Sequence, residues 1–95
     1  MSALENLSIE ARLADELIGS LAPESVEIRD RGEAIEFRLR KRGWKLGQVL
    51  LSKFSLRKMA GERDGRVKLE YLRRDIERSA VTRRRYSFPR NLRLS

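Results

Sequence analysis

Arginine and aromatic residues are interleaved in residues 83–90, which read RRRYSFPR. A guanidinium group neutralises phosphate and an aromatic ring stacks on an exposed base, so this composition is typical of segments that contact nucleic acid. Two alternatives stay open: the aromatic residues are spaced as in a strand and could pack on the core, or the segment is a free arm without a ligand. The candidate nucleic-acid-binding residues here are Arg83, Arg84, Arg85, Tyr86, Phe88 and Arg90.

A second basic group lies near the middle of the chain. If Ile35, Phe37 and Leu39 face the core from a strand, the residues between them face the opposite side, next to a basic turn. This geometry predicts a positive patch made of Arg38, Arg40, Lys41, Arg42 and Lys45. The alternative is a solvated sheet face whose charged turn discourages edge pairing. Trp44 lies beside the turn, and we expect it to be a core residue rather than a stacking platform.

The net charge of +8 is distributed unevenly. Residues 1–36 contain nine acidic and three basic residues, whereas residues 37–95 contain five acidic and nineteen basic residues. Arginine outnumbers lysine by 17 to 5, which favours bidentate recognition of phosphate or carboxylate groups, although a GC-rich genome would produce the same bias. We therefore expect the second part of the chain to meet a negatively charged partner, either nucleic acid or an acidic protein surface.

The chain contains no cysteine and no histidine. Disulfides, thiolate metal sites and the commonest zinc, copper and haem ligands are therefore excluded, as is the usual proton carrier at neutral pH. Ser55 and Lys58 match the Ser-x-x-Lys motif of penicillin-recognising enzymes, but a serine before a short helical run is an ordinary cap. We expect a protein without enzymatic activity, without a cofactor and without a metal site.

Apolar spacing predicts the elements that position the basic residues. A helix is expected over residues 8–22, where large aliphatic residues recur every four positions. Three strands are expected over residues 25–30, 34–41 and 44–52. The connections between these strands are short and contain glycine, which favours an antiparallel meander.

Helical spacing returns after the third strand. A short helix capped by Ser55 is expected to end at Gly61, followed by a longer helix from residue 66 to about residue 84. Residues 66–72 also alternate as in a strand, so a strand in that place stays an alternative. The final segment has no sustained period and is expected to form an irregular arm.

These elements define an α+β fold with an N-terminal helix, a three-stranded antiparallel meander, one short helix and one longer helix, or α-β-β-β-α-β-α in the alternative. Residues 1–85 are expected to form a single domain and residues 86–95 a basic, flexible C-terminal arm. Double-stranded-RNA-binding domains and metal-dependent nucleases share part of this order. The chain lacks the lysine-rich helix start and the histidine-containing loop of double-stranded-RNA-binding domains. The third predicted strand lacks the acidic residues that bind metal in the nucleases.

The sequence has no segment that resembles a signal peptide and no run of about 20 apolar residues, so a cytoplasmic protein without a membrane partner is expected. Its predicted function is that of a non-enzymatic nucleic-acid-binding module, with RNA slightly favoured over DNA. The alternative is a small adaptor or regulator that forms a homodimer through the broad apolar face of its first helix.

Overall fold

The computed structural model describes residues 8–92. Within them the chain forms helix α1 (Ile9–Ser20), strands β1 (Ser25–Asp30), β2 (Ala34–Arg40) and β3 (Gln48–Ser52), helices α2 (Lys53–Ala60) and α3 (Gly65–Ser79), and strand β4 (Arg85–Phe88). The α+β class and the order of a helix, three strands and further helices are confirmed, and β4 follows them.

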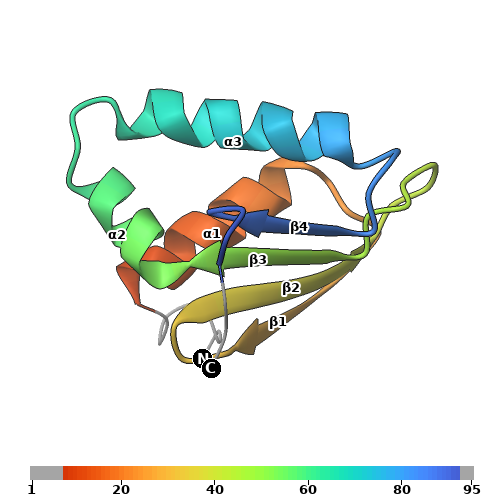
Figure 1. Ribbon diagram of the computed structural model, residues 1–95, viewed down its shortest axis with the longest axis horizontal. Helices are drawn as coiled ribbons and strands as arrows, with labels where there is room; N and C mark the ends of the chain where they lie inside the picture. Colours follow the sequence, from red (N-terminus) through yellow and green to blue (C-terminus); the bar gives the residue numbers. More distant parts are fainter. Residues whose placement is uncertain (1–7, 93–95) are drawn as a thin grey trace.

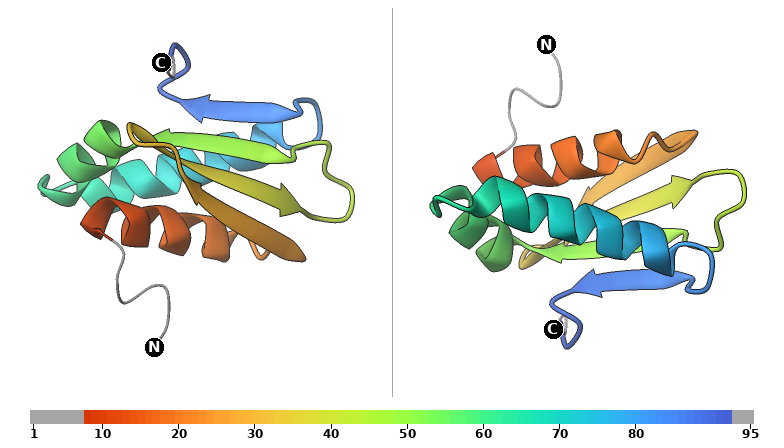
Figure 2. Two further views of the ribbon diagram at one scale, coloured as in Figure 1. Left: turned by 90° about the horizontal axis from the view of Figure 1, so that it is seen from below. Right: turned by 90° about the horizontal axis from the view of Figure 1, so that it is seen from above.

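The strands of the described chain form one sheet in the order β1-β2-β3-β4. The β1–β2 and β2–β3 pairs are antiparallel, as the short turns predict, whereas β3 and β4 are parallel. A parallel neighbour requires a crossover connection, which α2 and α3 provide. Helices α1 and α3 lie on one side of the sheet (Figure 1), and the other side is free of helices in the described chain (Figure 2). We call this uncovered side the open face.

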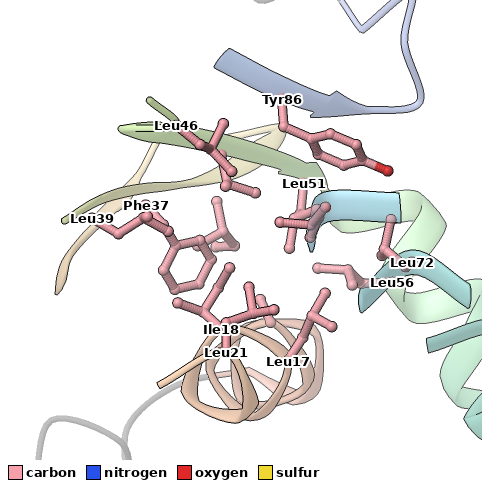
Figure 3. Close-up of a cluster of buried hydrophobic side chains, with 14 of the residues drawn as sticks. Leu17, Ile18, Leu21, Phe37, Leu39, Leu46, Leu51, Leu56, Leu72 and Tyr86 are labelled. Atoms are coloured by element: carbon pink, nitrogen blue, oxygen red, sulfur yellow. The ribbon is translucent and has the colours of Figure 1, made fainter. Parts of the chain in front are cut away.

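The hydrophobic core fills the space between the sheet and the helices (Figure 3). Its side chains come from all the helices described above and from β2, β3 and β4, and Phe37, Leu51 and Ile76 are completely buried. Burial of a side chain of this size contributes about 1.5–3 kcal/mol. Strand β1 contributes no buried side chain, so packing weakens from the centre of the sheet toward this edge.

Helix α1 begins where the sequence indicates. The Ser8 hydroxyl oxygen accepts a hydrogen bond from the Ala11 N–H at 3.3 Å, which satisfies one of the free donors of the first turn. The helix ends before Ala22, whose φ is +51°, and Pro23 follows. Proline restricts the residue before it to non-helical geometry, so the chain turns here toward β1.

Strand β3 is shorter than predicted, because it begins at Gln48 rather than at Trp44. The Lys45 and Leu46 N–H groups donate to the Ala80 carbonyl at 2.8 and 3.0 Å rather than to β2. The first part of the predicted strand is therefore a loop that is held by the chain segment after α3. Alternating apolar residues alone could not indicate this competing partner.

Helix α2 begins two residues before the predicted cap. Ser52 is the N-cap, and its hydroxyl oxygen accepts a hydrogen bond from the Ser55 N–H at 3.3 Å. Residues 66–72 belong to α3, as favoured by the longer helical pattern, but α3 ends at Ser79 rather than near residue 84.

The corner between α2 and α3 depends on Gly65. A Cβ atom at this position would collide with the Met59 carbonyl oxygen, which is fixed backbone. The side-chain-free residue therefore permits the close approach that lets α3 turn back over the sheet.

The irregular arm predicted for residues 86–95 is wrong in its first part, because β4 pairs with β3 there. Tyr86 is only 5% exposed, and Phe88 packs half-buried against the core. Their two-residue spacing, which left an added strand open as an alternative, places both rings on the core side of the sheet. Residues 1–7 of the predicted domain and residues 93–95 of the predicted arm lie outside the described residues.

Candidate functional site

Two loops that are far apart in the sequence meet at one end of the molecule: the loop between β2 and β3, and the loop between α3 and β4. The Lys45 N–H donates to the Ala80 carbonyl at 2.8 Å, and the Gly47 N–H donates to the Arg84 carbonyl at 3.0 Å. Figure 1 shows both loops at the same end of the sheet. The two basic groups that the sequence indicates in separate segments are therefore joined by backbone hydrogen bonds.

Strand β4 extends this basic region onto the open face. In the sheet register, Arg38, Gln48 and Arg85 lie in one row across β2, β3 and β4. Neighbouring strands are about 4.8 Å apart, so the backbones of Arg38 and Arg85 are separated by about 10 Å. The residue after Arg85 points the opposite way, since Tyr86 is buried in the core. The alternation of the strand therefore directs Arg85 to the open face.

The Tyr86 side chain also holds β4 against α3. Its hydroxyl group donates a hydrogen bond to Asp75 Oδ2 at 2.6 Å. Burial and the adjacent Asp75 carboxylate raise the pKa of Tyr86 above its usual value, so the phenol keeps its proton and remains a donor.

The joined loops carry basic residues without acidic ones. Residues 37–48 and residues 78–92 each contain five basic residues and no acidic residue. Within the described chain, the members of this group that lie outside α3, close to the loop junction, and that are exposed and outside every ion pair are Arg40, Arg42, Lys45, Arg83, Arg84 and Arg85. We call these six residues the basic end. Unpaired like charges gathered in this way create a positive potential that attracts anions.

Lys41, a predicted site residue, is occupied inside the protein. Its Nζ atom donates a hydrogen bond to the Leu21 carbonyl at 2.6 Å and lies 4.9 Å from the centre of the Trp44 ring. Trp44 itself packs half-buried against the core, as expected, although it lies in the loop before β3. Both residues therefore hold the loop between β2 and β3 in place instead of offering free ligand groups.

Arg38, also predicted, lies on the open face but is paired with a buried carboxylate. Glu36 is only 1% exposed and accepts hydrogen bonds from Arg31 at 3.2 Å, Arg38 at 3.1 Å and Gln48 at 2.9 Å. Burial opposes the ionisation of Glu36, yet the hydrogen bonds from Arg38 and Gln48 outweigh it, and its pKa lies below the usual value. The ionised carboxylate neutralises part of the charge of Arg31 and Arg38.

The remaining residues of the predicted arm are not brought together with the basic end. Tyr86 and Phe88 use their rings in packing, which removes them as exposed stacking platforms. Arg90 follows β4, and its carbonyl accepts a hydrogen bond from the Ser87 hydroxyl at 3.4 Å. Because β4 runs away from the loop junction, Arg90 lies beyond the opposite end of this strand from Arg85.

The arginines of α3 differ from those of the loop that follows. Arg73 forms ion pairs with Glu70 and Glu77, and Arg74 lies 3.5 Å from Glu70. The hydrogen bond from Arg73 lowers the pKa of Glu70. Residues three and four positions apart are neighbours on a helix surface, so this spacing is typical of local ion pairs.

An open pocket of about 370 Å³ lies between α3 and β4 and is lined by Met59, Lys68, Tyr71, Leu72, Asp75, Arg78, Tyr86 and Phe88. Its lining is mainly apolar, and its one carboxylate, Asp75, already accepts the Tyr86 hydrogen bond. Residues 8–92 contain no group of three or more potential metal-ligating acidic, histidine or cysteine side chains. None of the helices within these residues is long and apolar enough to span a membrane.

Sequence reasoning missed two residues that organise the surface. Gln48 lies between Arg38 and Arg85 in the sheet row, and Glu36 is a buried carboxylate on a face for which the sequence predicts a positive patch or, in the alternative, a solvated surface. The two-residue spacing of Tyr86 and Phe88 could have predicted the row of Arg38, Gln48 and Arg85. It indicates a fourth strand, and such a strand beside β3 brings Arg85 onto the open face. The burial of Glu36 depends on surrounding long side chains, which no local pattern indicates.

No protein-family model, no curated protein and no solved structure matches the chain. Arguments about its function therefore rest on the geometry and charge of the surfaces described above.

Proposed function

We propose that the protein is a non-enzymatic nucleic-acid-binding module that contacts phosphate groups through the basic end, with RNA slightly ahead of DNA. One observation carries the proposal: backbone hydrogen bonds join two loops without acidic residues, and six exposed basic side chains outside ion pairs gather there. Five of the six are arginines, whose planar guanidinium groups suit bidentate contact with phosphate oxygens.

The proposed contacts position a ligand without reading its sequence. Each basic residue that neutralises a phosphate releases counterions, so affinity should fall steeply with salt. The aromatic rings of β4 are packed, and the basic end offers mainly charged groups, which favours recognition of backbone and shape over base edges. The slight preference for RNA follows from this reliance on shape.

The test is the triple substitution of Arg83, Arg84 and Arg85 by alanine. All three side chains are exposed, and the Arg84 carbonyl that joins the loops is retained, so the fold should persist. The slope of log affinity against log salt should fall in magnitude by roughly 2 to 3, given about 0.9 for each phosphate contact on duplex DNA and about 0.7 on single strands. Fluorescence titrations with RNA and DNA, each single- and double-stranded, measure this slope.

The matched control is the triple substitution of Lys58, Arg63 and Arg66 by alanine. It removes the same charge from exposed side chains near the corner of α2 and α3, at the other end of the molecule (Figure 1). Its effect on the salt slope should be small. Equal losses in the two variants would reduce the proposal to nonspecific net charge, and an unchanged slope in the folded Arg83–Arg85 variant would refute it.

The alternative function, an adaptor that self-associates through α1, has weaker support. Most apolar side chains of α1 are buried in the protein's own core, among them Ala14, Leu17 and Ile18. Ile9 stays exposed and Leu13 half-buried, which leaves a small apolar surface for a partner.

A further inference from the structure

Strand β1 ends the sheet, and no residue of the described chain pairs with its outer edge. All its residues are exposed, including the apolar Val26 at 45% and Ile28 at 36%. In the register with β2 these two lie opposite Leu39 and Phe37, so they continue the apolar side of the sheet beyond the area covered by the core. An exposed strand edge with apolar side chains is a template for a further strand.

The direction of the backbone groups of β1 follows from its ladder with β2. The Arg31 N–H donates to the Ala34 carbonyl at 2.9 Å, in continuation of the β1–β2 register. Hydrogen-bonded positions alternate along an antiparallel ladder, so the odd-numbered residues of β1 also bond to β2. The residues that direct their N–H and C=O groups to the free edge are Val26, Ile28 and Asp30.

Two copies of β1 related by a two-fold axis can pair antiparallel at this edge through the free N–H and C=O groups. Three registers place the axis near the middle of the strand, at Glu27, at Ile28 or at Arg29. A register centred on Glu27 sets two glutamates opposite each other, and one centred on Arg29 sets two arginines opposite each other. A register centred on Ile28 sets Glu27 of each copy opposite Arg29 of the other. Opposite charges across an antiparallel pair stabilise it and like charges destabilise it, so charge selects the Ile28 register.

The side chains that would meet are available. Glu27 and Arg29 have side-chain exposures of 62% and 52%, and their distance of 3.9 Å within one chain marks a weak, solvated ion pair. Asp30, which would lie opposite Val26 of the second copy, is already satisfied by Lys53 at 2.8 Å. No carboxylate would therefore be left without a partner on the apolar side.

We propose that two copies of this chain associate through β1 in the antiparallel register centred on Ile28. The two-fold axis is then perpendicular to the sheet, so the sheets continue into one and both open faces lie on the same side. This interface is separate from the basic end, and its existence does not depend on nucleic-acid binding.

Charge reversal tests the register by sedimentation velocity over a range of concentrations. Glu27→Arg and Arg29→Glu, each alone, place like charges opposite each other twice in the symmetric dimer and should weaken association about tenfold or more. The double variant E27R/R29E exchanges the two charges and should recover most of the association. A chain that stays monomeric at all concentrations, or a double variant as weak as the singles, would overturn the proposal.

Cysteine substitution gives a readout that is independent of charge, because Glu27 and Arg29 also face Arg38 and Glu36 across β2. The chain has no cysteine of its own, so each variant carries one thiol. In the proposed register the two residues 28 are a hydrogen-bonded pair with Cα atoms about 5.5 Å apart, within disulfide range. Ile28→Cys should therefore cross-link under mild oxidation, and Glu27→Cys and Arg29→Cys should not. Preferential cross-linking at 27 or 29, or at none of the three, would contradict the register.

Discussion

Helix α3 and the segment that follows it, residues 80–85, are both rich in arginine, but their arginines differ in electrostatic surroundings. Arg73 and Arg74 lie among Glu70 and Glu77 at three- and four-residue spacing and form ion pairs with them. Arg83, Arg84 and Arg85 lie in a segment without acidic residues and form no ion pair within the described chain.

The difference shows that the number of arginines does not define a binding surface. A helix brings each arginine next to the residues three and four positions away, so a helical segment rich in both signs neutralises itself. The loop and β4 lack this periodic contact, and their basic residues meet other basic residues from the loop between β2 and β3. Arg83, Arg84 and Arg85 therefore stay outside ion pairs because they lie beyond the helix, in a segment without acidic residues.

Substitutions of Tyr86, which anchors the segment containing Arg83–Arg85 to the core, should have the largest effect on stability. Tyr86→Ala removes a buried ring and should lower the free energy of unfolding by about 3–5 kcal/mol. Tyr86→Phe removes only the hydrogen bond to Asp75 and should cost about 1 kcal/mol. Urea unfolding measures both values. A Tyr86→Ala variant as stable as the unsubstituted chain would show that β4 does not hold the loop.

On the open face, substitution of Glu36 removes the ion pairs that this carboxylate forms with Arg31 and Arg38. Glu36→Gln should lower the free energy of unfolding by about 1.5–3 kcal/mol at neutral pH, since a neutral amide replaces a buried charged acceptor. The lowered pKa of Glu36 means that its stabilising effect is present above the ordinary value of 4.5 and is lost as pH falls through the lower folded-state pKa.

The measurement for Glu36 is the unfolding free energy of both proteins between pH 7 and pH 3. The difference between them should shrink as pH falls below about 4.5. A constant difference across this range would mean that the ionised carboxylate is not what holds the two arginines.

The smallest expected effect comes from freeing the arginines of α3. Glu70→Gln with Glu77→Gln removes the ion pairs of Arg73 and Arg74 and should cost about 0.3–0.5 kcal/mol of stability for each pair. If the ion pairs keep Arg73 and Arg74 from contacting phosphate, the salt slope of nucleic-acid binding should steepen by up to roughly 1.4 to 1.8, at about 0.7 to 0.9 for each of the two arginines.

Glu62→Gln with Asp64→Asn is the control for this pair of substitutions. It frees Lys68 at the other end of α3 by the same change in charge. The same steepening in both variants would assign the effect to net charge and would remove the distinction between α3 and the loop.

Much of the fold could be predicted from the sequence where a local pattern decides it. Ser8 as the cap of α1, the exact span of β1 and the antiparallel meander follow from capping chemistry, alternation and glycine turns. The start of β3 and the existence of β4 do not, because both depend on hydrogen bonds between segments about 35 to 40 residues apart.

The candidate site was predicted in parts rather than as a whole. Arg40, Arg42 and Lys45 are exposed as expected, since alternation and a turn decide their placement. Lys41 differs from its neighbours because the Leu21 carbonyl and the Trp44 ring lie within its reach, a contact that only the packed structure provides. The joining of these residues to Arg83–Arg85 required the position of β4.

The corner between α2 and α3 has an evolutionary consequence. Any β-carbon at position 65 would strike the Met59 carbonyl, so descendants that keep this corner cannot vary the residue, however far their surface charges drift. An invariant glycine six positions after the Met59 equivalent, followed at once by a helix, is therefore a marker by which distant relatives of this chain can be recognised. A relative with another residue there must have rebuilt the corner and moved α3.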